Sequence, residues 1–187
     1  GHVYIAQPPL YRYKKGKEEI YLKDEKALTE FLLKTSIANF RIVNQKKSMN
    51  EEEMKKFVLD ILKFEEIVRL KSNEFDPEFC RFLASMNVNL DKMTEDETYC
   101  RDVFAQIKKK ISDGKSPLIN LELVSFDGAN HKFVFRTTQM GNQKTSVIDS
   151  YAIKTGQWKS LFAVWQNLQA VVSLPIQGQA EKGDVSE

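Results

Sequence analysis

Four basic side chains lie close together near the start of the chain, at Arg12, Lys14, Lys15 and Lys17, and no acidic residue precedes Glu18. Lysine and arginine bind nucleic-acid phosphates through charge and N–H donors, without reading the base sequence. The cluster therefore predicts sequence-independent phosphate contacts. The alternative interpretation is that these are solvated charges at the end of a strand.

The sequence contains none of the common catalytic signatures. It has no G-x-G-x-x-G, no G-x-x-x-x-G-K-[ST], no H-E-x-x-H and no G-x-S-x-G. Its two histidines, His2 and His131, are isolated, so a histidine base or a nucleophilic triad has nothing to assemble from. No Asp-x-Asp pair is present to hold a divalent ion. We therefore predict no catalytic residue, no metal site and no cofactor-binding residue in this chain.

The two cysteines, Cys80 and Cys100, have neither a C-x-x-C partner nor a histidine at ligand spacing, so zinc is unsupported. We predict two free thiols packed as small apolar side chains, which fits a reducing compartment. The formal net charge is only +2, so any contact with a polyanion must come from local clusters. No run of about 18 apolar residues and no signal peptide are present, and we expect a cytoplasmic protein without a membrane partner.

The first part of the chain has the pattern of short strands around one helix. Residues 3–6 and 18–22 have the composition of strands, and a helix opens at residues 23–25. Residues 36–43 alternate between apolar and polar side chains, which predicts a further strand with one buried face. The predicted apolar face of the helix consists of Ala27, Leu28, Phe31 and Leu32.

Helical periodicity dominates the middle of the chain. Ser48 or Asn50 can cap a helix that runs to about Lys71, with three glutamates at its positive end. A short helix begins at Asp76, and residues 94–97 have the capping-box spacing that starts a longer one. The predicted buried positions are Met54, Phe57, Ile61, Phe64 and Val68 in the first helix, Phe79, Phe82 and Leu83 in the second, and Cys100, Val103, Phe104, Ile107 and Ile111 in the third.

Three lysines, Lys108, Lys109 and Lys110, lie in the last turn of the third helix, shortly before Gly114, which is a natural stop. Cations in this position suit the negative end of the helix dipole. Contact with phosphate is the alternative, and we favour the dipole interpretation.

From Leu118 the hydrophobic period changes to two, with Ile119, Leu121 and Leu123 on the face that we expect to be buried. Turns at residues 127–128 and 140–142 then predict a three-stranded meander that carries Phe133, Phe135, Val147 and Ile148.

A final helix is predicted from about Thr155, with a strong apolar stripe. Its two tryptophans, Trp158 and Trp165, could form a stacking platform for bases, but their helical spacing favours the core. Residues 177–187 are polar and read as a linker or frayed end. The other members of the stripe are Leu161, Phe162, Leu168 and Val172.

The opening G-H-V-Y-I-A-Q-P-P-L-Y-R, with the K-K-G-K that follows, closely resembles the B subunits of DNA gyrase at the point where their TOPRIM domain finishes. That family continues with Y-[IL]-K-D-[DE]-[EA]-A-L, which corresponds here to residues 21–28. The resemblance covers residues 1 to about 33. Since the sequence starts inside this motif without an initiator methionine, we expect it to be part of a longer protein.

The resemblance implies a division into a C-terminal TOPRIM remnant (1–34), the insert domain of many Gram-negative gyrase B subunits (35–174) and a tail (175–187). The expected fold is α+β, with a small antiparallel meander, several packed helices and a terminal strand and helix. The family's metal-binding acidic motifs, E-G-D-S-A and Asp-x-Asp, have no match in this sequence.

For the whole enzyme, the resemblance implies an ATP-hydrolysing type IIA topoisomerase that uses magnesium, acts on DNA and assembles two B with two A subunits. This chain would hold support structure without the catalytic centre, be inactive alone, and brace TOPRIM against DNA or the gyrase A protein. The alternatives are a free-standing intracellular interaction module and the corresponding subunit of topoisomerase IV.

Overall fold

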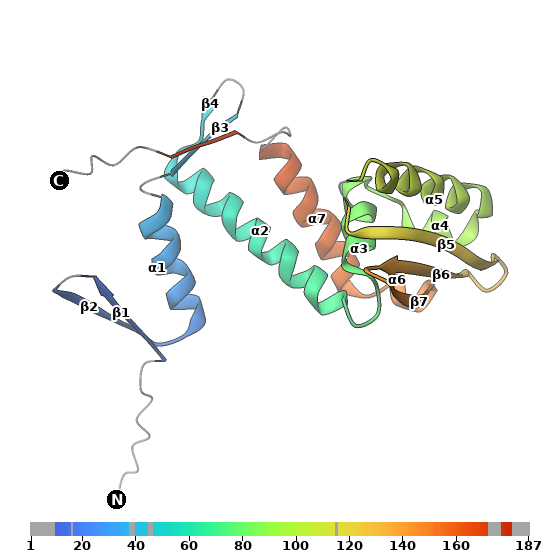
Figure 1. Cartoon of the computed structure of the whole chain (residues 1–187), viewed down its shortest axis with the longest axis horizontal. Coiled ribbons are helices and arrows are strands. Elements are labelled where there is room, and N and C mark those ends of the chain that lie inside the picture. The colour runs from blue at the N-terminus through green and yellow to red at the C-terminus, as the bar shows by residue number, and fades with distance from the viewer. Residues whose placement is uncertain are drawn as a thin grey trace, which may run out of the picture. The chain divides into compact units, whose positions relative to one another are not determined.

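The computed structural model describes residues 10–15, 17–37, 40–44, 47–114, 116–171 and 177–180 of the chain. It confirms an α+β fold, with helices and small antiparallel sheets (Figure 1). The chain divides into two compact units, and each is treated by itself. One consists of Gly1–Leu59 with Val171–Glu187, and the other of Asp60–Ala170.

The first described elements are a hairpin and a helix. Strands β1 (Tyr11–Lys15) and β2 (Glu18–Leu22) pair antiparallel. Helix α1 (Glu25–Ile37) follows, and Asp24 caps it by accepting a hydrogen bond from the Ala27 N–H at 2.7 Å. The predicted second strand and helix are therefore confirmed, whereas strand β1 was not expected and the predicted strand at residues 3–6 lies outside the described residues. Leu32, predicted to be buried, is exposed.

A second small sheet has the order β4-β3-β8. Its strands are β3 (Phe40–Asn44), β4 (Lys47–Ser48) and β8 (Gln177–Ala180). The strand predicted at residues 36–43 was wrong at its start, because α1 continues through Ile37. Four residues of the predicted linker form β8, paired in register with β3, and the rest of that segment lies outside the described residues.

Helix α2 runs from Glu51 to Lys71, as the periodicity predicted. Asn50, the second of the two predicted caps, closes a capping box: its Oδ1 accepts from the Glu53 N–H at 2.8 Å, and its own N–H donates to Glu53 Oε2 at 3.1 Å. Of the predicted stripe, Met54, Phe57, Phe64 and Val68 are buried and Ile61 is half-buried.

Three helices follow in the second unit: α3 (Pro77–Ser85), α4 (Leu90–Glu95) and α5 (Glu97–Ser112). The capping box predicted from Thr94 was wrong, because Thr94 lies inside α4, where its hydroxyl donates to the Asp91 carbonyl. The cap of α5 is Asp96, whose Oδ1 accepts from the Tyr99 N–H at 3.0 Å. All five predicted core positions of α5 are buried, and Gly114 follows its end at φ +71°.

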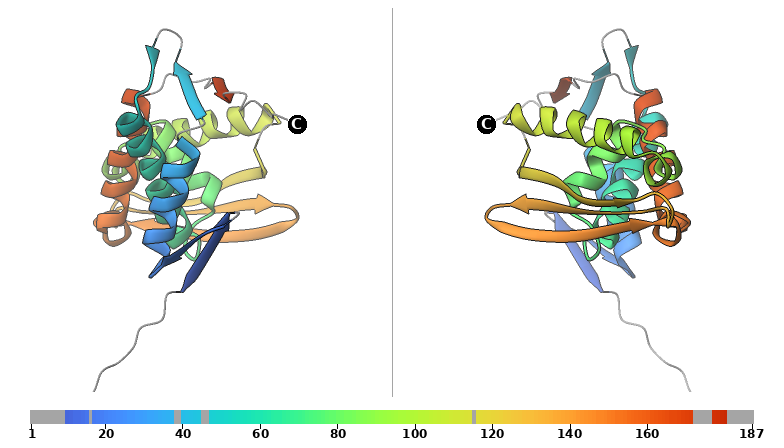
Figure 2. Two further views of the ribbon diagram at one scale, coloured as in Figure 1. Left: turned by 90° about the vertical axis from the view of Figure 1, so that its left-hand side faces the viewer. Right: turned by 90° about the vertical axis from the view of Figure 1, so that its right-hand side faces the viewer.

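The predicted meander is confirmed as a sheet of order β5-β6-β7. Its strands are β5 (Leu118–Asp127), β6 (Lys132–Gln139) and β7 (Asn142–Asp149), and α5 runs along β5 (Figure 2). Ile119, expected to be buried, is 63% exposed because a register shift between Leu118 and Asn120 moves it out of the alternation. Val147 is also exposed, because it lies on the opposite face from Ile148.

An aromatic cluster holds the sheet to the helices of the second unit. Phe135 on β6 lies with its ring centroid 4.2 Å from Phe79 on α3 and 6.0 Å from Phe104 on α5. Phe75, in the turn before α3, contacts both Phe135 and Trp158 on α7 (Gly156–Val171). Since Trp158 is only 1% exposed, it belongs to the core, as the spacing favoured. Helix α6 (Ser150–Ile153) links β7 to α7.

Side chains of β7 also hold the turn that follows α2. The Lys144 ammonium donates to the Ser72 carbonyl and, at 3.3 Å, to the Phe75 carbonyl. The Ser146 hydroxyl donates to the Glu74 carbonyl at 2.7 Å. These bonds pair carbonyl groups of the loop between α2 and α3, which belong to neither helix. They fix the position of the turn relative to the sheet.

Candidate nucleic-acid interface

The β1–β2 hairpin separates its side chains onto two faces. Along β1, Tyr11 and Tyr13 are half-buried while Arg12 and Lys14 are exposed. Tyr13 packs edge-on against Phe31 of α1, with the ring centroids 4.8 Å apart. The aromatic face therefore attaches the hairpin to the helix, and the basic face points to solvent.

On the basic face, two cations share one carboxylate. Arg12 Nη2 lies 2.6 Å from Glu19 Oε1, and Lys14 Nζ lies 3.4 Å from the same oxygen. The Tyr21 hydroxyl donates to Glu19 Oε2 at 3.3 Å. The register explains this convergence, because Lys14 is directly opposite Glu19 and Arg12 is opposite Tyr21. The hydrogen bond from Arg12 is the main reason why the pKa of Glu19 is lowered.

The other two predicted phosphate contacts lie at the end of the hairpin. Lys15 pairs in register with Glu18, and only its backbone is described. Lys17 is exposed in the turn before β2. The structure thus brings Arg12 and Lys14 together on one face, while Lys17 lies at the turn. Sequence reasoning missed Glu19 and Tyr21. Their spacing of two residues on the strand that follows the turn was a usable signal, because it places them on one face of that strand.

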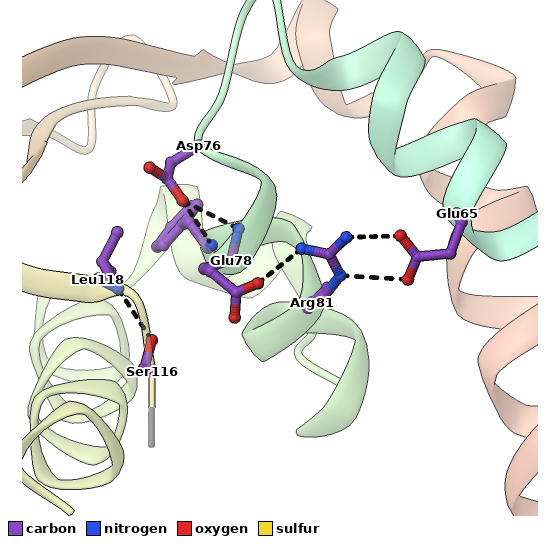
Figure 3. A network of polar contacts seen from close by, with 7 residues as sticks. Glu65, Asp76, Glu78, Arg81, Ser116 and Leu118 are labelled. Atoms are coloured by element: carbon purple, nitrogen blue, oxygen red, sulfur yellow. Dashed lines mark hydrogen bonds and ion pairs between the residues drawn. The ribbon is translucent and has the colours of Figure 1, made fainter. Parts of the chain in front are cut away.

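A second polar network, centred on Arg81, has a structural role. Arg81 on α3 binds Glu65 of α2 through Nε at 3.2 Å and Nη2 at 2.5 Å, and binds Glu78 through Nη1 at 2.6 Å (Figure 3). These two carboxylates raise the pKa of Arg81, and the hydrogen bonds to Glu65 are the largest cause. The nearby Asp76 caps α3. The network joins α2 to α3. Its carboxylates are already engaged, because Glu65 and Glu78 pair with Arg81 and Asp76 caps α3.

Within the described residues, no three His, Cys, Asp or Glu side chains lie close enough together to hold a metal ion. His131 faces Glu95 at 3.6 Å, and both side chains are largely exposed. Among the helices that the structure describes, none is long and apolar enough to cross a membrane.

Both cysteines are free and fully buried, as predicted. Burial raises the pKa of the Cys80 thiol and of the Cys100 thiol from 9.0 to about 12. We expect iodoacetamide to alkylate neither thiol in the folded chain at mildly alkaline pH, and both in urea, because the thiolate is the nucleophile. Mass spectrometry after timed quenching measures this, and rapid native alkylation would contradict the burial.

The same burial predicts a pH dependence of stability. An unfolded thiol ionises near pH 9.0, whereas the folded thiol keeps its proton to about pH 12. Above pH 9.0 the unfolded state therefore binds fewer protons, and the free energy of unfolding should fall by about 1.4 kcal/mol per thiol for each further pH unit. Urea titrations above pH 9.0 measure how the free energy of unfolding changes with pH. The Cys100→Ala variant should show a smaller fall, because only the Cys80 thiol then contributes.

Two protein-family models match consecutive segments of the chain. Residues 9–38 match a model described as "GyrB, hook", and residues 38–174 match the DNA gyrase B subunit insert domain. The second match covers more than half of the chain. The chain belongs to the DNA gyrase B family. The boundary between the two gyrase B models falls at residue 38, and the hook match contains the whole β1–β2 hairpin.

Individual gyrase B proteins align with parts of the chain. The DNA gyrase B protein of Rickettsia bellii is 32% identical over 102 residues, which are 54% of this chain and 13% of that protein. The DNA gyrase B protein of Campylobacter jejuni is 70% identical over 37 residues, 20% of this chain and 5% of that protein. The type 2 topoisomerase B protein of Aquifex aeolicus is 38% identical over 89 residues, 47% and 11% respectively. The chain therefore spans only a small part of these relatives, and the matches favour gyrase over the topoisomerase IV alternative.

Proposed function

We propose that this chain is a supporting segment of an ATP-hydrolysing, DNA-supercoiling topoisomerase and is inactive alone. The observation that carries the proposal is the adjoining pair of matches to the gyrase B hook and insert models over residues 9–174. In this proposal ATP and magnesium act in other parts of the gyrase B protein. The sequence supports this division of roles, because it lacks the acidic motifs that would hold the metal.

The proposed role of the segment is mechanical. The insert domain would brace the TOPRIM domain against DNA or against the gyrase A protein, in an assembly of two A and two B subunits in the cytoplasm. The hairpin would supply sequence-independent phosphate contacts through Arg12, Lys14, Lys15 and Lys17. The exposure of Arg12 and Lys14, at 56% and 60% of their side chains, supports this proposal.

The phosphate contacts can be tested by replacing Arg12, Lys14, Lys15 and Lys17 with Ala. We expect weaker binding to a fluorescent duplex of about 20 base pairs and a weaker dependence of that binding on salt. Each phosphate contact contributes about 0.9 to the slope of log K against log salt concentration. Since Glu19 already pairs with two of the four cations, we expect this slope to fall by about 2 to 3. Anisotropy titrations at several salt concentrations measure both quantities. A parallel titration with the gyrase A protein tests the bracing contact.

A control variant removes three positive charges elsewhere, at Lys108, Lys109 and Lys110 on α5. These lysines should leave the salt slope unchanged if they serve the helix dipole. An unchanged slope in the hairpin variant would contradict its phosphate role. A loss of binding in both variants, in proportion to the number of charges removed, would show that the effect is one of total charge.

A further inference from the structure

The hairpin already contains a bound anion, and that anion is its own Glu19. Three donors from different positions converge on this carboxylate: the Arg12 guanidinium at 2.6 Å, the Lys14 ammonium at 3.4 Å and the Tyr21 hydroxyl at 3.3 Å. A phosphate group in a nucleic acid uses the same kinds of donor, with arginine, lysine and tyrosine prominent among them. The face is therefore built to hold an oxyanion.

We propose that Glu19 is an internal competitor for phosphate: its carboxylate occupies the position of a backbone phosphate and must release Arg12 and Lys14 before the hairpin can bind DNA. This inference rests on the proposed phosphate role of the hairpin. Glu19 then sets the affinity of the site. A phosphate that binds here replaces the Glu19 carboxylate. The free energy of DNA binding is therefore less favourable than it would be if Arg12 and Lys14 were unpaired.

The exchange is physically accessible. Arg12 and Lys14 have more than half of their side-chain surface exposed, and Glu19 about a third. Ion pairs exposed to this degree contribute little to stability, and water screens them. A duplex with a high density of phosphates can therefore displace the carboxylate without disturbing the fold.

Protonation of Glu19 does not control this exchange near neutral pH. The hydrogen bond from Arg12, with smaller contributions from Lys14 and Tyr21, keeps the pKa of Glu19 below its ordinary value. The charged groups facing it are Arg12 and Lys14 from β1, and within β2 it accepts a hydrogen bond from the Tyr21 hydroxyl. Glu19 therefore stays ionised, and competition depends on the concentration of the anion and of salt.

The decisive variant is Glu19→Gln, which keeps the shape of the side chain and removes its charge. We expect duplex binding about tenfold tighter at about 50 mM salt, and a salt slope larger by about 0.9 for each cation released. The matched control is Glu30→Gln, which removes one charge from an exposed position of α1, outside the hairpin. That control should tighten binding by no more than about twofold, through the general field alone.

The results separate this inference from the proposed function. The first comparison is between the unmodified chain and the variant with four alanine substitutions. If these two bind the duplex equally, or if no variant binds at all, the hairpin does not contact phosphate, and the competitor role of Glu19 fails as well. If those two differ but Glu19→Gln and Glu30→Gln behave alike, only the competitor role fails. Circular dichroism of both Gln variants should match the unmodified chain, because neither side chain is part of the core.

Discussion

Replacing Phe135 with Ala should lower the free energy of unfolding by about 3 to 5 kcal/mol, the largest loss that we expect from a single side chain. The ring is fully buried in the middle strand of the β5-β6-β7 sheet. It contacts Phe79 and Phe104 on the helices, and it also lies near Phe75 and Phe133. Its removal would leave a cavity that neighbours from four different segments cannot all fill.

Urea denaturation followed by tryptophan fluorescence measures this loss, since Trp158 contacts Phe75 in the same cluster. The control is Tyr151→Ala, another aromatic side chain, which is 84% exposed. That change should stay within about 0.5 kcal/mol of the unmodified chain. A cost below about 1 kcal/mol for Phe135→Ala would mean that the aromatic cluster does not hold the sheet to the helices.

The sequence predicted this part of the fold well, because its patterns are local. Phe133 and Phe135 alternate with partly exposed neighbours in a strand, and the five apolar positions of α5 repeat at helical spacing. Periodicity of this kind depends only on the geometry of one element. The same is true of Asn50, whose capping box with Glu53 is formed within one turn.

The failures arise where a second element decides the outcome. Ile119 fits a buried alternation, but the pairing of β5 with β6 shifts by one residue there. Thr94 has the spacing of a cap, but the short helix α4, which Asn89 caps, already contains it. The candidate site shows the same limit. Arg12 and Lys14 were visible in the sequence, but their common partner Glu19 depends on the register of a hairpin whose first strand was not predicted.

Replacing Lys71 with Ala should lower the free energy of unfolding by about 2 to 4 kcal/mol. Lys71 is the last residue of α2 and is only 1% exposed. Its ammonium lies 5.3 Å from the Phe75 ring centroid and 5.2 Å from that of Trp158. Nearby oxygens belong to Thr155, at 3.3 Å, and to the exposed Glu74, at 3.6 Å. The alanine variant loses both the charge between the rings and the methylenes that fill the space beside them.

Lys71→Met separates these two contributions, because methionine keeps most of the volume and has no charge. We expect this variant to remain within about 1 kcal/mol of the unmodified chain, since a buried charge bears a desolvation cost that its partners only repay in part. Glu74 is left in solvent and not buried alone, so removal of its partner leaves no stranded charge in the core. Urea titrations of both variants near neutral pH provide the comparison. If methionine destabilised the chain as much as alanine does, the ammonium itself, between Phe75 and Trp158, would be what holds α2 against α7.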